Sequence, residues 1–300
     1  MIEIKKNLSI LSLASIILIL INFFALIVCI SCSHLTISDT SPIPTSLQHI
    51  NTIKLSFIPQ KICYCEYSNT FLILDDKYDC IFRVDNKGRI QQKIGEFGFD
   101  KSQFVTIADI STDSFGNLFV LDNVSNKVVQ YDEFGQFVNC SSYSEVYEPE
   151  LIAVKDNGDI ILYDSSSNEI YCFDNTKNLC YNFGKFDFIN PSEIAVSNDI
   201  NFVLDKGSNS IIAFDNFGGV VTQYKSNNKI IDISTTKCFM YYIDDKANIF
   251  CCKKYQNFKH SLASLTDNFP LIIPQLIISY NKTIGIIDNN KIYLFQLLNN

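Results

Sequence analysis

The sequence is poor in histidine, with three in 300 residues: His34, His49 and His260. Histidine is a common ligand of catalytic zinc and the general base of the Ser-His-Asp triad. Its scarcity therefore argues against a His-ligated zinc or iron centre and against a serine-hydrolase triad. Alanine and methionine are also scarce, whereas Ile, Val, Phe and Tyr are abundant, which favours strands over helices.

The repeated part of the chain contains no cluster of Lys and Arg, and the formal net charge is −8. Nucleic-acid binding needs a basic footprint that replaces the counterions of the phosphates. The composition therefore excludes a nucleic-acid partner.

A short apolar run ending in Asp, a polar turn and a second apolar run recur along the chain. The first Asp of each copy is Asp75, Asp122, Asp164, Asp205, Asp244 and Asp288, at intervals of 47, 42, 41, 39 and 44 residues. In four copies a second Asp follows ten residues later, at Asp85, Asp132, Asp174 and Asp215. A period of about 40–50 residues built from strand-like units is typical of β-propellers.

Each repeat divides into four short strands. In the second repeat these are residues 106–112, 117–122, 127–132 and 136–141, separated by turns rich in Asp, Asn and Gly. Four antiparallel strands per repeat, without helical periodicity, indicate one propeller blade. The sequence therefore predicts an all-β, six-bladed propeller over residues 50–300.

The last repeat ends at residue 300 without a fourth strand, and the run at 50–57 precedes the first repeat without a partner. We expect 50–57 to complete the sixth blade by pairing with 291–297. This closure would cover the open edges of a single, monomeric ring.

The run 107–138 (IADISTDSFGNLFVLDNVSNKVVQYDEFGQFV) and IGEFG at 94–98 resemble the NHL-repeat family of β-propellers. The resemblance extends over residues 61–225 and, more loosely, 226–298, where Lys254 and Phe295 stand in place of the second Asp. It implies a propeller fold and says almost nothing about activity.

The N-terminal segment differs in kind from the repeats. Lys5 and Lys6 precede a 23-residue apolar run, 8–30, long enough to span a bilayer. Cys29-Ile30-Ser31-Cys32 also resembles a bacterial lipobox, with Cys32 as the candidate lipidation site. An uncleaved anchor and a lipoprotein signal both remain open for residues 1–32. Either one, followed by a polar tether at 33–49, places the propeller outside the cytoplasm in the cell envelope.

Two sets of carboxylates are candidates for function. The six first-position Asp residues would form a ring; the alternative, which their Asn- and Ser-containing turns favour, is that each caps its own turn. The second set comprises Asp109, Glu150, Glu193 and Asp232, at the start of the strands that should line the channel. In calcium-dependent propeller hydrolases, carboxylates in this position bind the ion. The alternative is that these acids are simply solvated.

Eleven cysteines are unusual for an exported protein. Beyond the leader, most of them lie in apolar strands, as expected of small buried side chains. Cys63 and Cys65 have a spacing poorly suited to a closed metal site. If a disulfide forms, Cys172 and Cys180 on neighbouring strands are the pair we expect.

The sequence thus predicts a membrane-tethered propeller that binds a protein or glycan ligand without catalysis. The alternative is a calcium-dependent hydrolase or lyase acting at the channel mouth, and Ca²⁺ is the one cofactor considered. Tyr78, Tyr143, Tyr147 and Phe186 lie in or near predicted loops, where they either anchor a ligand or pack over the blade ends.

Overall fold

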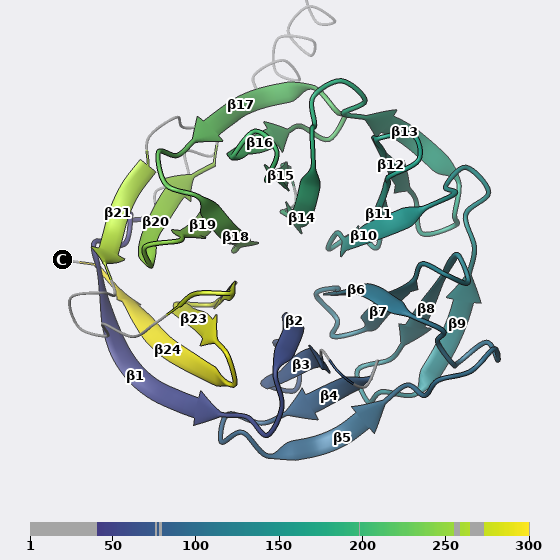
Figure 1. Ribbon diagram of the computed structural model, residues 1–300, viewed down its shortest axis with the longest axis horizontal. Helices are drawn as coiled ribbons and strands as arrows, with labels where there is room; N and C mark the ends of the chain where they lie inside the picture. The colour runs from purple at the N-terminus through teal and green to yellow at the C-terminus, as the bar shows by residue number, and fades with distance from the viewer. Residues whose placement is uncertain are drawn as a thin grey trace, which may run out of the picture. The chain divides into compact units, whose positions relative to one another are not determined.

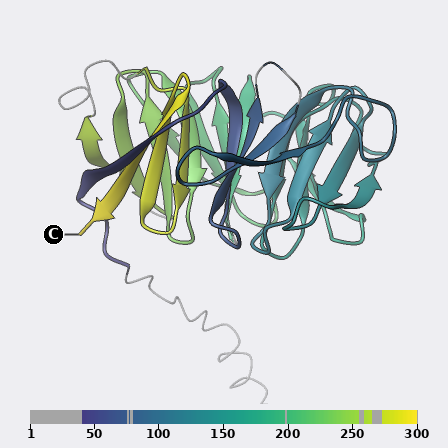
Figure 2. The ribbon, with the colours of Figure 1, turned by 90° about the horizontal axis from the view of Figure 1, so that it is seen from below.

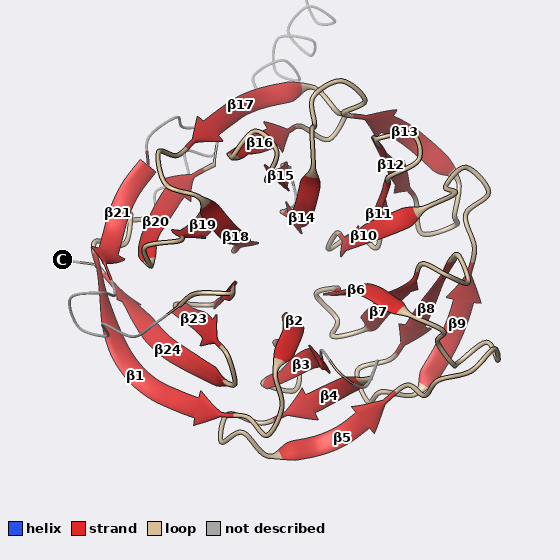
Figure 3. Cartoon of the chain, viewed as in Figure 1, coloured by secondary structure: helices blue, strands red, loops and turns tan. Residues whose placement is uncertain are grey.

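The computed structural model describes residues 41–299 except 76, 78–79, 198, 255–258 and 265–272. These residues form 24 strands in six four-stranded antiparallel sheets, and Figure 3 shows strands and loops only. The prediction of an all-β, six-bladed propeller is confirmed. The predicted anchor at 8–30 and Cys32 lie outside the described residues. Within the described part, no helix has the length and hydropathy of a membrane span.

Each blade follows the chain from its innermost to its outermost strand. Blade 1 comprises β2 (Pro59–Cys65), β3 (Thr70–Asp75), β4 (Ile81–Val84) and β5 (Ile90–Ile94). Blade 2 comprises β6 (Ile107–Thr112), β7 (Leu118–Asp122), β8 (Lys127–Tyr131) and β9 (Phe137–Ser141). Blade 3 comprises β10 (Pro149–Val154), β11 (Ile160–Asp164), β12 (Glu169–Phe173) and β13 (Leu179–Phe183).

The second half of the ring repeats this order. Blade 4 comprises β14 (Pro191–Val196), β15 (Asn201–Asp205), β16 (Ser210–Phe214) and β17 (Val220–Lys225). Blade 5 comprises β18 (Ile230–Thr235), β19 (Phe239–Asp244), β20 (Asn248–Lys253) and β21 (Lys259–Ser264). Blade 6 comprises β22 (Leu276–Tyr280), β23 (Thr283–Asp288), β24 (Lys291–Leu298) and β1 (Ser46–Lys54). Figure 1 shows the innermost strands around the centre of the ring, and Figure 2 shows the ring edge-on.

The N-terminal strand β1 closes the ring by pairing with β24, from Ser46 opposite Leu298 to Lys54 opposite Lys291. The strand thus begins four residues earlier and ends three residues earlier than the predicted 50–57, so 46–49 belong to the blade and not to the tether. The sequence pattern misplaced these bounds because β1 is an outermost strand. Its side chains are mostly exposed, and a bulge between His49 and Asn51 breaks the alternation.

The core lies between neighbouring blades. The second strands β3, β7, β11, β15 and β19 are buried at every position, whereas the outer strand β17 is mostly exposed. A blade that packs on both faces needs apolar side chains on both faces of its middle strands. The continuous runs FLIL and LFVL therefore occur where an isolated half-exposed sheet would show alternation.

The repeated Asp residues tie loops together at the ends of the blades. The fully buried Asp122 accepts hydrogen bonds from the amides of Val105 (2.9 Å), Thr106 (3.3 Å) and Ser125 (3.1 Å). Asp75, Asp164, Asp205 and Asp244 likewise accept amide hydrogen bonds from their own turns. In the described part of the chain, no backbone amide donates to the carboxylate of Asp288.

In the four repeats that have a second Asp, this residue caps the turn before the outermost strand. Asp85, Asp132, Asp174 and Asp215 each accept amide hydrogen bonds from residues two and four positions later. Asp132, Asp174 and Asp215 are only half-buried, in contrast to the fully buried Asp122, Asp164, Asp205 and Asp244.

We expect Asp122→Ala to lower the free energy of unfolding by about 3 kcal/mol, because it removes a fully buried carboxylate and leaves three partly buried amides without their acceptor. Asp132→Ala is the matched control. Its carboxylate also accepts two amide hydrogen bonds, from Phe134 and Gln136, but in an exposed turn where water replaces it. We expect a loss below about 1 kcal/mol there. Urea unfolding measures both, and equal losses would contradict the structural role assigned to Asp122.

Candidate functional site in the central channel

In five of the six blades, a β-bulge near the start of the innermost strand sets which side chain enters the channel. In blades 1–5 the register shifts by one residue just before Lys61, Asp109, Leu151, Glu193 and Asp232. In blade 6 the residue with the equivalent strand partner is Leu276, opposite Ile287. These six residues occupy equivalent positions and therefore lie at one level of the channel.

Lys61 crosses the channel at this level. Its Nζ lies 3.3 Å from Asp109 Oδ1 on the neighbouring blade and donates a hydrogen bond to the Glu193 carboxylate. Blades 1 and 4 are three positions apart in a ring of six, so the Lys61–Glu193 ion pair joins opposite sides. The two side chains are 18% and 22% exposed. We call Lys61, Asp109, Glu193 and Asp232 the Lys61 cluster.

Asp109 and Asp232 have a second role. The innermost strand has a free edge, so its amides need acceptors outside its own sheet. Asp109 Oδ2 accepts from the amide of Ile152 (3.0 Å), and Asp232 Oδ2 accepts from the amide of Ile277 (2.8 Å). Each carboxylate thus ties its blade to the next blade in the ring.

The electrostatics of the cluster follow from burial and from an excess of carboxylates. Burial raises the pKa of Glu193, and Lys61 only partly offsets this effect. Burial also raises the pKa of Asp232, against the hydrogen bond from Ile277 and the charge of Lys61. Burial on its own lowers the pKa of Lys61. The negative charges of Asp109 and Glu193 have the larger combined effect, so the pKa of Lys61 is raised above its ordinary value and the ammonium group stays charged. The cluster therefore has one firmly charged cation, Lys61, and two carboxyl groups with raised pKa values, Glu193 and Asp232.

The structure brings three of the four predicted channel acids together, and Glu150 is not among them. Glu150 is the bulged residue of β10, is exposed, and leaves Leu151 at the level of the cluster. The grouping of Glu150 with the others was therefore wrong. The interval from the channel residue to the first Asp of the repeat varies from 12 residues, for Glu193, to 14, for Lys61. Because the turn between the two strands varies in length, counting back from the repeat Asp does not identify the residue that faces the channel. In blade 3 that residue is Leu151 and not Glu150.

Lys61 is the functional residue that sequence reasoning missed. The sequence did offer a sign of it. Lys61 stands near the start of an innermost strand, at the position where the second, fourth and fifth repeats carry Asp109, Glu193 and Asp232. Calcium takes six to eight oxygen ligands, and here an ammonium group already contacts two of the three carboxylates. This arrangement does not fit a calcium ion. Among the described residues, no group of three or more His, Cys, Asp or Glu is placed to hold a metal ion.

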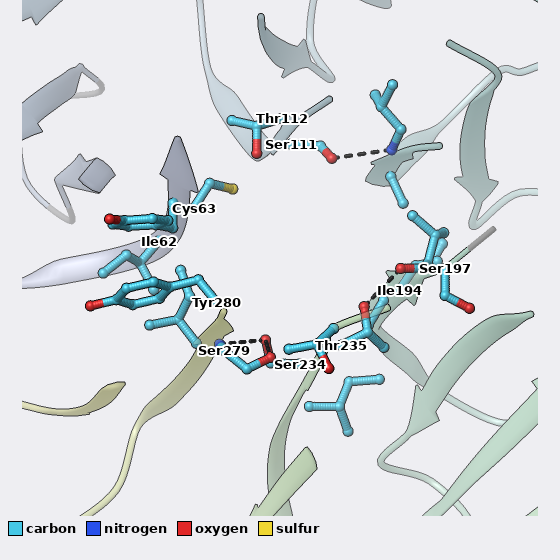
Figure 4. A pocket seen from close by; sticks show the side chains of 18 of the residues that line it. Ile62, Cys63, Ser111, Thr112, Ile194, Ser197, Ser234, Thr235, Ser279 and Tyr280 are labelled. Carbon is cyan, nitrogen blue, oxygen red and sulfur yellow. Dashed lines mark hydrogen bonds between the residues drawn. The ribbon is translucent and has the colours of Figure 1, made fainter. Parts of the chain in front are cut away.

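A cavity of about 500 Å³ extends along the channel from the Lys61 cluster. All six innermost strands line it, and Figure 4 shows side chains from several of them around it. At the other end it reaches exposed turn residues, among them Glu66, Asp156 and Lys237, so it is accessible from solvent there. We call that end of the ring the turn end.

Away from the charged groups at its two ends, the polar lining of the cavity consists largely of hydroxyl groups on the innermost strands. They belong to Ser111, Thr112, Ser197, Ser234, Thr235 and Ser279. Several hold the blades together: Ser111 accepts from the amide of Val154 (3.1 Å), and Thr235 donates to the carbonyl of Val196 (2.7 Å). In the described part of the chain, the Thr112 hydroxyl has no hydrogen-bond partner, which leaves it available to a ligand.

The remaining predicted residues lie elsewhere. All nine described cysteines are free thiols, so the expected Cys172–Cys180 disulfide is absent. Cys172 is buried opposite Tyr181, whereas Cys180 is exposed, because adjacent positions on a strand point to opposite faces. Tyr143 is buried against Phe173, with ring centroids 4.5 Å apart. Tyr147 and Phe186 are exposed, and Tyr78 lies outside the described residues.

Comparison with known proteins identifies the fold and not the family. No family model matches the chain, and no curated protein matches it. A streptogramin B lyase structure has a TM-score of 0.58 at 17% identity, over 85% of this chain and 88% of that one. A gluconolactonase from Xanthomonas campestris has a TM-score of 0.62 at 12% identity, over 87% and 96%. The Cps50 (Swd1) propeller domain of Myceliophteria thermophila has a TM-score of 0.59 at 9% identity, over 84% and 100%.

Proposed function

We propose that the protein is a non-catalytic binding propeller of NHL-like type, tethered in the cell envelope by residues 1–32, whose central cavity holds a glycan. The observation that carries the proposal is the hydroxyl-rich lining of the 500 Å³ cavity. A volume of this size lies in the range of small-molecule sites, and placed hydroxyl groups match the alternating donors and acceptors of a saccharide.

The polar groups at the cavity are better suited to binding than to proton transfer. Histidine is absent from the residues that line it. The carboxylates of the Lys61 cluster are committed to Lys61 or to backbone amides. A general base must be free to take a proton from the substrate. The proposal of a binder follows from this arrangement.

The test is a calorimetric titration of the propeller with a panel of neutral di- and trisaccharides. We expect at least one to bind with a Kd below about 1 mM. Thr112→Val keeps the side-chain shape but removes the free hydroxyl, so we expect affinity to fall about tenfold. Thr222→Val, on the outermost strand β17, is the control and should leave binding unchanged. Absence of binding by the whole panel, or equal affinity in Thr112→Val, would contradict a glycan site in the cavity.

The second candidate is a hydrolase or lyase that acts in the same cavity. The observation in its favour is Glu193, a partly buried carboxyl at the end of the cavity whose pKa is raised to about 8, as expected of a general acid. A lyase and a gluconolactonase also share the fold. Turnover of gluconolactone or of streptogramin B, abolished in Glu193→Gln and preserved in Thr222→Val, would favour this candidate.

A further inference from the structure

The side chains that face the channel follow a pattern that repeats after three blades. At the level of the Lys61 cluster, blades 1–3 carry Lys61, Asp109 and Leu151, and blades 4–6 carry Glu193, Asp232 and Leu276. Two residues further along the six strands stand, in the same order, Cys63, Ser111, Ala153, Ala195, Ser234 and Ile278. An acid and a serine therefore recur on blades 2 and 5, and two apolar side chains recur on blades 3 and 6.

The acid and the serine cap the free edge of the next blade. Asp109 and Ser111 of blade 2 accept hydrogen bonds from the amides of Ile152 (3.0 Å) and Val154 (3.1 Å) in blade 3. The acid and the serine of blade 5 accept in the same way from two amides of blade 6. Figure 4 shows the bonds made by both serines. Two of the six inner edges are thus covered by side-chain acceptors.

The inner edge of blade 4 lacks such acceptors. The amide of Ser197 bonds to the carbonyl of Ile200 within the hairpin, so the amides of Val196 and Ile194 point away from β15 and toward the channel. The side chains of blade 3 at these two levels are apolar and cannot accept a hydrogen bond. In the described part of the chain, no side chain accepts from either amide. Blade 4 therefore offers two backbone donors to a ligand.

Blade 1 presents the same arrangement on the facing wall. Leu276 and Ile278 of blade 6 are apolar, and among the described residues no side chain accepts from the amides of Ile62 and Tyr64. Figure 4 shows Ile62 and Ile194 on opposite sides of the cavity, and all four donor residues line it. The cavity thus has two facing walls on which free amide donors lie beside apolar side chains.

We propose that these walls bind the acetamido groups of an N-acetylated saccharide. The carbonyl oxygen of the acetamido group accepts from a free amide, and its methyl group packs against the neighbouring apolar side chain. The inference rests on the glycan site of the proposed function and specifies the class of glycan. A sugar hydroxyl can accept from the same amide, but it leaves the apolar surface beside it uncovered.

The charges of the cavity favour a neutral acceptor over an anionic one. A carboxylate on the ligand would also accept from the free amides, but Glu193 and Asp232 line the same cavity. Lys61 already contacts two carboxylates of its cluster. An additional buried anion would therefore face like charges, which raise its energy. An amide carbonyl supplies a strong acceptor without this cost.

The wall of blade 4 has the space for such a group. Ala153, Ile194 and Val196 all line the cavity, and alanine has no side-chain atom beyond Cβ. At the equivalent seam between blades 2 and 3, the hydroxyl of Ser111 occupies this place and bonds to the amide of Val154. The seam between blades 3 and 4 leaves that place open to the ligand.

Calorimetric titration of the full chain with three trisaccharides of the same linkage tests the class of glycan. Cellotriose carries hydroxyl groups where triacetylchitotriose carries acetamido groups and chitotriose carries amino groups. We expect triacetylchitotriose to bind at least about tenfold more tightly than cellotriose, because it adds a carbonyl acceptor and a buried methyl group.

The other outcomes separate this inference from the proposed function. Equal affinity for cellotriose and triacetylchitotriose would leave the glycan site but overturn acetamido recognition. Tightest binding of chitotriose would also overturn it, since the carboxylates and not the amides would then select the ligand. If other saccharides bind but triacetylchitotriose does not, only the acetamido inference is wrong. If no saccharide binds at all, the proposed function fails with it.

Ala153→Ser tests the position of the site. The new hydroxyl stands where Ser111 and Ser234 have theirs, so it should accept from the amide of Val196 and preserve the fold. We expect the affinity for triacetylchitotriose to fall about tenfold and that for cellotriose to stay within about twofold. Ala108→Ser, outside the cavity lining, is the matched control and should change neither. Thermal unfolding shows that both variants fold. Unchanged affinity of Ala153→Ser for triacetylchitotriose would overturn the site.

Discussion

Replacement of Lys61 by Met is expected to lower the free energy of unfolding by about 3 kcal/mol at pH 8, because it leaves the buried Asp109 and Asp232 and the partly buried Glu193 without their cation. Methionine has a stem of similar length, so the main loss is the charge and its hydrogen bond to Glu193. Lys246→Met, in an exposed turn of blade 5, is the matched control and should change the free energy by less than about 0.5 kcal/mol.

The pH dependence separates a lost charge from a lost packing contact. The folded pKa values of Asp232 and Glu193 are raised to about 6 and about 8. The folded state therefore binds more protons than the unfolded state between about pH 4 and pH 8, and stability falls as pH rises through that window. Removal of Lys61 raises both pKa values further, so the free energy of unfolding decreases more between pH 4 and pH 8 in the variant than in the parent.

Urea unfolding of the parent and of Lys61→Met at pH 5 and at pH 8 measures this effect. We expect the difference between the two proteins at pH 5 to be less than half of that at pH 8, because protonated carboxyl groups no longer need the ammonium. A difference that is the same at both pH values would show that Lys61 contributes packing only. The ion pair would then not stabilise the channel.

Removal of β1 is expected to have the largest effect on the ring. A chain that begins at residue 56 loses the buried side chains of Ile53 and Leu55 and leaves the edge of β24 unpaired. The cost is about 5 kcal/mol or more from the apolar burial and the strand hydrogen bonds together. An open edge also promotes aggregation. A chain that begins at residue 42 keeps β1 and serves as the control.

Thermal unfolding and light scattering compare the two truncated chains. We expect the chain from residue 56 to unfold at a much lower temperature and to self-associate. A peptide of residues 42–56, added in trans, should restore the transition because it can add itself as the missing strand. Equal stability of the two chains would contradict closure of the ring by β1.

The repeat itself was readable from the sequence because it depends on local chemistry. Asp122 and Asp132 accept amide hydrogen bonds from residues two to four positions later, and those contacts follow directly from sequence spacing. The contacts of Asp122 with Val105 and Thr106 do not, because they join it to the preceding loop. The fully buried middle strands are likewise evident as unbroken apolar runs. The closing strand could be placed approximately, since β24 lacked a partner, but not its bounds, because an outermost strand carries little apolar pattern.

The site was harder to read because it depends on register across the ring. Lys61 and Glu193 are 132 residues apart and meet only because two bulged strands face each other across the channel. The difference between Glu150 and Leu151 is a single bulge, which no local pattern in the sequence marks.

The central claim is that the cavity binds a glycan and leaves it chemically unchanged. The direct measurement is mass spectrometry of the saccharide panel after prolonged incubation with the propeller, on both the retained and the free fractions. We expect the parent chain to retain at least one saccharide and to release it with its original mass. Thr112→Val should retain less of the same saccharide. A saccharide cleaved or dehydrated by the parent protein, or no saccharide retained at all, would contradict it.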